Sequence, residues 1–497
     1  MKKLEMPAAV GKALRAVGKR IEMPGGVGDA MRSMGQRIEV PDAVSEVVRS
    51  VGLSTAMRAA GVVTGVLPIP QPALLVGSGS SARLGETLAG FGHQKVLIVT
   101  DKIISGMGLL HGLTGALDAG GTKHVVFDEI TPDAPLPVIE KGIKVCEGSG
   151  CDAIVAFGGG SSMDAAKAIG LSVANKKHPR QLVGYFKGRR APMPIYAVPT
   201  TAGTGSEVTV AAVISDPEHG KKLVIYDTRL VPQMAALDPA LMTGLPRPVT
   251  AATGMDALTH AIEAYVGKWA TPHTDRLALM AVGMIYKNLP VAYEDGKNLV
   301  AREQMSLAST YAGLSFTRAN VGYVHAIAHQ LGGKYHVPHG LANAIMLPHV
   351  LKFLSPAVTG RLADLAVRAG VGKDSERAAV LAKKFIDSVE AMNRDLGIPT
   401  QVDALREEDI PALAKAACWE ADTNYPVPRY MSPKICEGIL RDVLPSKTPE
   451  KAPAKAAAKA PAKRAGKATA RARAKAPAKR AGKAAAKAPA RRRPAAA

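Results

Sequence analysis

The chain is poor in cysteine and has no long apolar run, and both shortages exclude classes of protein. Four cysteines in 497 residues do not make a disulfide scaffold, and none forms a CxxC pair: Cys146, Cys151, Cys418 and Cys436. We therefore expect a protein of the reducing cytoplasm. The best apolar stretch, residues 61–76, is broken by three prolines and falls short of the roughly 20 apolar residues of a spanning helix. Residues 1–14 lack the continuous apolar core of a secretory signal.

Acidic residues are absent from the last part of the chain, and this explains most of the net positive charge of the whole chain. Residues 451–497 hold sixteen Lys or Arg and no Asp or Glu, whereas the whole chain has a net charge of +22. Residues 1–65 contribute +4, so residues 66–450 keep only +2. With 47% hydrophobic and 21% charged residues, disorder throughout is excluded. The basic charge belongs to the tail and not to the large middle region.

The tail, residues 447–497, is almost wholly Ala, Lys, Arg and Pro. It has too little apolar surface to offset chain entropy, so we expect it to be disordered. Its composition is similar to the tails of linker histones, which favours binding to DNA, RNA or polyphosphate with strong salt dependence. A tail that only improves solubility is the alternative.

Residues 1–65 contain a repeat with a period of 17 residues. Its three units begin at Leu4, Ile21 and Ile38. In each unit the next residue is Glu, and Pro stands two residues after that Glu. Apolar residues recur on one helical face and a glycine ends each unit, which predicts three short amphipathic helices. Such short helices are marginally stable alone and require their apolar face to be packed against another surface. They either dock on a granule, a shell, a partner protein or a membrane surface, or pack on each other or on the main body.

The middle region changes its period near residue 250. Short β-branched runs alternate with helical stretches before that point, which predicts a parallel α/β domain over residues 66–247. The runs are Ala73–Val76, Lys95–Thr100, His124–Phe127, Ala153–Phe157 and Ile195–Val198. Residues 248–446 have helical periodicity throughout and predict an all-helical second domain.

Two loops that follow predicted strands are candidates for cofactor binding. Gly159, Gly160 and Ser161 come between a strand and a helix, where glycines and a helix N-terminus suit a pyrophosphate. The spacing is not GxGxxG, and a tight turn is the alternative. Thr200, Thr201 and Thr204 lie in the second loop and suit a phosphate or ribose, or else cap a turn: PTTAGTGSE, 199–207.

Asp101 ends a predicted strand. A carboxylate there suits a ribose diol and repels a 2′-phosphate, which favours NAD over NADP. The alternative is an ordinary turn residue or helix N-cap.

The helical half contains two pairs of metal-ligand residues at i, i+4. Asp256 and His260 form one pair, and His325 and His329 form the other. His339 follows ten residues later. Each histidine alone could be a core or surface residue, but together they predict a metal site. Imidazole and carboxylate ligands suit Fe²⁺ or Zn²⁺ without choosing between them.

Four segments resemble the iron-dependent, group III, alcohol dehydrogenase family. They are GGGSSMDAAKAIG (158–170), PTTAGTGSEVT (199–209), TGMDALTHAIEAY (253–265) and AGLSFTRANVGYVHAIAHQLGGKYHVPHGLANAIMLPHV (312–350). The resemblance covers about residues 66–446. It implies an α/β dinucleotide-binding domain and an all-α metal-binding domain, the dehydroquinate synthase-like fold, with the active site between them. The N-terminal repeats and the tail depart from the family.

The resemblance also implies roles for individual residues. Asp256, His260, His325 and His339 match the four metal ligands, and His329 matches a histidine near the substrate that relays a proton. Lys222 is similar to the family lysine near the nicotinamide ribose, and the loop glycines and threonines match residues that line NAD. Phe316 and its neighbours would line the substrate pocket.

The implied activity is NAD-linked oxidation of small primary alcohols or diols, or reduction of aldehydes, by hydride transfer at Fe²⁺. The metal ion would lower the pKa of the bound alcohol. We expect a homo-oligomer, a dimer or higher. A polyol dehydrogenase, a hydroxyacid–oxoacid transhydrogenase and a polyanion- or granule-associated organiser are the alternatives.

Overall fold

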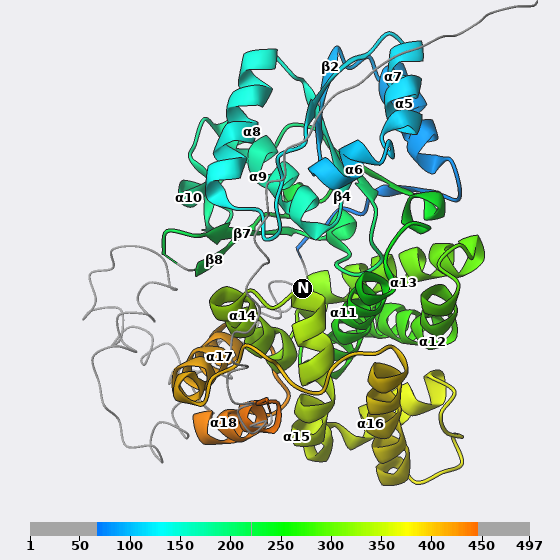
Figure 1. Cartoon of the computed structure of the whole chain (residues 1–497), viewed down its shortest axis with the longest axis vertical. Helices are drawn as coiled ribbons and strands as arrows, with labels where there is room; N and C mark the ends of the chain where they lie inside the picture. The colour runs from blue at the N-terminus through cyan, green and yellow to red at the C-terminus, as the bar shows by residue number, and fades with distance from the viewer. Residues whose placement is uncertain (1–66, 220, 446–497) are drawn as a thin grey trace, which may run out of the picture. The chain divides into compact units, whose positions relative to one another are not determined.

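The computed structural model describes residues 67–445 apart from residue 220. The predicted helical repeats (1–65) and the predicted disordered tail (447–497) lie outside the described residues. Strands and helices alternate up to residue 237, and only helices follow from residue 247 (Figure 1). The predicted fold class, a parallel α/β domain followed by an all-helical domain, is confirmed.

Six strands form one parallel sheet in the order β1-β9-β6-β4-β2-β3. They are β1 (Ala73–Val76), β2 (Lys95–Val99), β3 (Lys123–Phe127), β4 (Ala153–Gly158), β6 (Ile195–Pro199) and β9 (Met234–Leu237). The sequence predicted all but β9. Its Met-Ala-Ala-Leu run has no β-branched residue, which was the signal that predicted the other strands. β9 lies in the sheet because it pairs with β1 on one side and with β6 on the other.

Helices cover both faces of this sheet, and side chains of each central strand alternate between two cores. Leu97 and Val99 of β2 pack with α8 (Leu136–Ser149) and α9 (Gly160–Asn175). Val96 and Ile98 pack on the other face with α5 (Ser80–Gly90) and α7 (His111–Ala119) (Figure 1). Burial on both faces is why the strands are continuous apolar runs.

A second, three-stranded sheet has the order β5-β8-β7, which the sequence analysis did not predict. Its strands are β5 (Gly184–Tyr185), β7 (Ala211–Asp216) and β8 (Lys221–Tyr226), and β7 pairs with β8 in antiparallel fashion. The short helices α6 (Lys102–Gly106) and α10 (Pro179–Leu182) complete this half. The small sheet matters because β8 includes Lys222.

The helical half packs around α11 (Arg247–Val266), which is buried without a break from Gly254 to Val266. A helix enclosed in this way shows no polar face, as expected for the centre of a domain. The other helices are α12 (Pro272–Glu294), α13 (Leu299–Ala319), α14 (Tyr323–Tyr335), α15 (His339–Arg368), α16 (Ala378–Asp395), α17 (Ile410–Asn424) and α18 (Pro433–Asp442).

Among the described residues, α15 is long and apolar enough to cross a membrane by length and composition. No such segment was expected from the sequence. Of the apolar window in this helix, 61% is buried within the protein, and Pro348 and Pro356 interrupt the helix. It is a core helix of the helical domain, and its apolar residues face other helices.

Candidate metal and cofactor site

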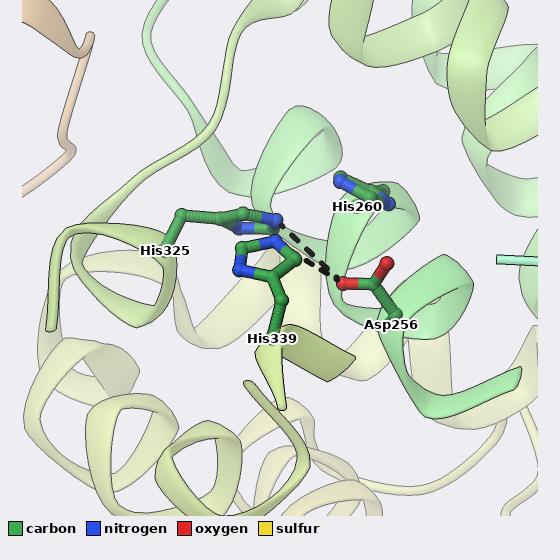
Figure 2. Close-up of side chains that lie close together, drawn as sticks. All are labelled: Asp256, His260, His325 and His339. Atoms are coloured by element: carbon green, nitrogen blue, oxygen red, sulfur yellow. Dashed lines mark ion pairs between the residues drawn. The ribbon is translucent and has the colours of Figure 1, made fainter. Parts of the chain in front are cut away.

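Four side chains predicted as ligands come together from three helices. Asp256 and His260 lie on α11, His325 lies on α14, and His339 is the first residue of α15. One ligand atom from each lies within 4.8 Å of the others. Figure 2 shows His325 and His339 directed toward the carboxylate of Asp256, with His260 beside them.

The distances within the cluster fit a single small ion. The Nε2 atoms of His325 and His339 lie 3.9 and 3.7 Å from the Oδ1 of Asp256. The rings of His260 and His325 stack with their centroids 4.5 Å apart. Asp256, His260 and His325 are buried, and His339 is partly exposed, so within the cluster it is the side of His339 that meets solvent.

A glycine allows α15 to begin directly over α11. A Cβ on Gly340 would lie 2.4 Å from the backbone oxygen of Ala252 and 3.2 Å from the Cβ of Asp256. Any larger residue would push the two helices apart. His339, its neighbour in sequence, is thereby held beside Asp256.

Glu263, which the sequence analysis did not single out, fixes the orientation of His325. Its Oε2 lies 2.6 Å from the Nδ1 of His325, and its Oε1 accepts the backbone N–H of Val324 at 2.7 Å. Burial raises the pKa of Glu263 to about 7 and lowers the pKa of His325 well below its usual range. Above neutral pH the pair is thus a carboxylate and a neutral imidazole, whose Nε2 lone pair is left for a metal ion.

The chemistry of this donor set fits a divalent cation. The carboxylate and neutral imidazoles offer lone pairs, and the Nδ1 of His260 is buried with no hydrogen-bond partner among the described residues. Buried polar atoms are rarely left without a partner unless another group satisfies them. Three imidazoles and one carboxylate suit Fe²⁺ or Zn²⁺.

His329 lies next to this cluster but outside it. Its Nδ1 is 2.6 Å from Oε1 of Glu420 on α17, and its ring stacks on His339 with the centroids 5.3 Å apart. Glu420 also accepts from Gln330 and Tyr425. Glu420 lies 91 residues from His329 in the sequence, so no local spacing could have revealed the pair.

The glycine loop lies at the carboxyl end of β4, as predicted, and leads into α9. Gly158 has a φ of +152°, and a Cβ there would lie 2.5 Å from the Oγ of Ser162. A Cβ on Gly160 would lie 2.8 Å from the Cγ2 of Thr204. Gly159 is the N-cap of α9, and the Oγ of Ser161 accepts the backbone N–H of Asp133. The loop brings backbone N–H groups and a helix N-terminus to one place, which suits a pyrophosphate.

The threonine loop follows β6, the neighbour of β4 in the sheet, so both loops meet at one edge. Thr200 donates its backbone N–H to the oxygen of Gly158, and Thr201 lies beside Gly159. The Oγ1 of Thr204 accepts the N–H of Ser206, so Thr204 also caps its own turn. In open α/β sheets, ligands bind at this carboxyl edge.

Lys222 lies near both the glycine loop, through Asp133, and α14 of the helical half. Its Nζ donates to Oδ1 of Asp133 at 2.8 Å and would lie 3.8 Å from a Cβ on Gly332 of α14. Burial first, then neighbouring histidines and the charge of Lys222, lower the pKa of His339 well below its usual range.

Asp101 is the N-cap of α6, since its Oδ1 accepts the N–H groups of Ile103 and Ile104. Asp101 therefore has the capping role that was the alternative to ribose binding. A contact with a ribose stays a prediction.

Comparison with known proteins identifies the family. Residues 71–239 match the iron-containing alcohol dehydrogenase family and residues 250–444 match the Fe-containing alcohol dehydrogenase family, C-terminal. The chain belongs to the iron-containing alcohol dehydrogenase family, whose members are oxidoreductases, and its helical half contains a cluster of four side chains that could hold a metal ion.

The relatives include enzymes of small alcohols and aldehydes. The NAD-dependent methanol dehydrogenase of Bacillus methanolicus is 40% identical over 70% of this chain and 91% of its own length. The lactaldehyde reductase of Escherichia coli is 39% identical over 69% of this chain and 90% of its own. A solved 1,3-propanediol oxidoreductase has a TM-score of 0.74 and 37% identity, covering 76% of this chain and all of the other.

Proposed function

We propose that the protein is a divalent-metal-dependent, NAD-linked dehydrogenase of small primary alcohols or diols that also reduces the matching aldehydes. The observation that carries this proposal is the cluster of Asp256, His260, His325 and His339 beside Lys222. Relatives named for methanol, lactaldehyde and 1,3-propanediol support the substrate class. Fe²⁺ is the proposed ion, with Zn²⁺ as the alternative.

The four cluster residues would hold the metal ion, and the two loops with Lys222 would hold the dinucleotide. A bound divalent ion supplies Lewis acidity, which lowers the pKa of an alcohol and polarises a carbonyl. The dinucleotide supplies the hydride acceptor or donor. The protein's part is to place the reacting carbon between the two and to exclude water from that place.

His329 is the proposed proton relay. Glu420 holds its Nδ1, which leaves Nε2 to exchange a proton with the substrate hydroxyl. With the side chain 18% exposed, the imidazole can release that proton to solvent. No strong base is required when an alcohol has a lowered pKa, so this relay would affect the rate rather than metal binding.

Phe316 gives the site an apolar wall. Its ring stacks on His260 with the centroids 4.2 Å apart. A substrate that reaches the metal ion would contact this ring, which favours small aliphatic alcohols over sugars.

The experiment is to load the full-length protein anaerobically with Fe²⁺ or Zn²⁺ and follow nicotinamide absorbance. Primary alcohols, diols and hydroxyacids are tested with NAD and with NADP, and a chelator-treated sample is the control. Metal-dependent turnover of a primary alcohol or diol with NAD supports the proposal. Turnover restricted to polyols, or to exchange between a hydroxyacid and an oxoacid without free NAD, would replace it with the corresponding alternative.

A further inference from the structure

One buried side chain touches three of the four proposed ligands without being one of them. Asn343 lies on α15 four residues after His339, and its side chain is fully buried. Its Nδ2 donates to the Oδ1 of Asp256 at 2.7 Å. The same nitrogen lies 3.2 Å from the Nε2 of His325 and 3.2 Å from the Nε2 of His339.

The chemistry of the neighbours assigns the orientation of this amide. Glu263 accepts from the Nδ1 of His325, so the Nε2 of that ring is an acceptor, as is the carboxylate of Asp256. The carboxylate of Asp256 can only accept, so the group that lies 2.7 Å from its Oδ1 is the NH₂ group of the amide, and the Nε2 lone pairs are left for a metal ion. The Oδ1 of Asn343 is buried with no hydrogen-bond partner among the described residues. Burying an acceptor without a partner costs free energy, so this orientation of the amide is held at a cost in stability.

Packing prevents the amide from moving away. Gly340 brings the first turn of α15 against α11, where a Cβ would lie only 2.4 Å from the Ala252 oxygen. Asn343 is one helical turn further along the same helix and on the same face as His339. The close contact between the two helices therefore fixes the distance between the amide and Asp256.

We propose that Asn343 is a positioning residue of the metal site, which holds the carboxylate of Asp256 in the orientation that binds a divalent cation. The inference rests on the proposed role of the cluster as a metal site. A free carboxylate can rotate and offer either or both oxygens, whereas an N–H bond to Oδ1 restricts it. Partners of this kind, one step outside the ligands, contribute about 10- to 100-fold to metal affinity.

The test compares Asn343→Leu and Asn343→Ala with a matched control, Asn393→Leu. Asn393 is also a buried asparagine of the helical domain with an unpartnered Oδ1, but its Nδ2 donates to the backbone oxygen of Ala344. The control therefore measures what replacing a buried amide does to the domain as a whole. Dissociation constants for Zn²⁺ and Co²⁺ are measured by competition with a chromophoric chelator, together with the visible spectrum of the Co²⁺-loaded protein.

We expect both Asn343 variants to bind the ions about 10- to 100-fold more weakly than wild type, with altered Co²⁺ bands. Asn393→Leu should bind within about threefold of wild type, with an unchanged spectrum. Wild-type affinity and spectrum in a folded Asn343 variant would overturn the inference, as would an equal loss in the control. If Asn343→Leu does not fold, Asn343→Ala decides.

Wild type and His260→Ala separate this inference from the proposed function. Failure of the wild-type protein to bind either ion would refute the metal site itself. Binding by wild type, loss in His260→Ala and no change in the Asn343 variants would refute only the role of Asn343.

Discussion

An imidazole binds a metal ion only through a neutral nitrogen, and the surroundings of this cluster keep two of its imidazoles neutral. Burial lowers the pKa of His325 and of His339 well below the usual range. Glu263 holds the Nδ1 of His325, which directs its Nε2 toward Asp256. The orientation of the site thus depends on residues that need not touch the metal ion.

Replacing Glu263 by Gln should weaken metal binding while leaving all four proposed ligands in place. The amide still fills the space but is a poorer acceptor for the Nδ1–H of His325. We expect the dissociation constant for Zn²⁺ to rise about 10- to 100-fold. Glu420→Gln is the matched control, because Glu420 holds His329 and not a proposed ligand. Equal metal affinities in the two variants would contradict the role given to Glu263.

His260 and His329 should respond differently to the same substitution. His260→Ala removes a proposed ligand and should abolish both bound metal and turnover. His329→Ala should retain the metal but turn over about 10²- to 10⁴-fold more slowly, the usual contribution of a positioned proton-transfer group. Metal content and initial rates on both proteins test this. Full metal retention in His260→Ala would exclude it as a ligand.

At the scale of elements, a buried lysine ties α9 to the threonine loop. The Nζ of Lys167 donates to oxygens of Ser206, Thr209 and Ala211 at 2.7–3.0 Å. On its far side the loop packs on the helical half, where Thr310 of α13 donates to the buried Glu207 at 2.8 Å. The loop is therefore anchored to both halves of the described chain, and its position between them depends on Lys167.

Replacing Lys167 by Met should destabilise the protein by about 3–5 kcal/mol, because it leaves buried acceptors and the nearby buried carboxylates of Asp164 and Glu207 without their cation. Urea unfolding measures this. Lys141→Met is the control, since Lys141 forms an exposed pair with Glu129 and should change stability by at most about 1 kcal/mol. Similar losses in both variants would show that Lys167 has no special structural role.

Lys167 should also give stability a distinctive pH dependence. Burial lowers its pKa to about 8. An unfolded lysine keeps its proton until about pH 10.4, so between these values the unfolded state binds more protons. The free energy of unfolding of wild type, relative to Lys167→Met, should therefore rise as the pH increases from 8 to 10. A flat or falling difference would mean that the folded protein keeps Lys167 charged.

The sequence predicted elements whose signal is local and missed those that depend on pairing. The runs rich in β-branched residues predicted five strands of the main sheet, and the i, i+4 spacing indicated the Asp256–His260 and His325–His329 pairs. β9 and the small sheet lack such a pattern. Glu420 had no local signal at all, whereas Asn343, four residues after His339, had a spacing that could have indicated it.

At the scale of the whole molecule, the family match and the excess charge fall on different parts of the chain. The matched segments lie within residues 71–444, whereas residues 451–497 contain sixteen basic residues and no acidic one. Residues 66–450 together have a net charge of only +2. We therefore assign catalysis to the matched region and propose that the tail, with the N-terminal repeats, binds a polyanion or a partner and so determines the location of the protein.

Deleting residues 447–497 should leave kcat and KM unchanged but abolish binding to DNA, RNA or polyphosphate. The full-length protein should bind these polyanions with an affinity that falls steeply with salt, with a log–log slope of roughly −0.9 for each phosphate neutralised on duplex DNA. Binding and kinetics are measured on the full chain, on the truncated protein, and on a control whose tail Lys and Arg residues are replaced by Gln. Because attraction to a polyanion requires charge, the control should behave like the truncated protein. If the truncated protein binds as tightly as the full chain, the nearly neutral body is the binding surface and the tail is only solubilising.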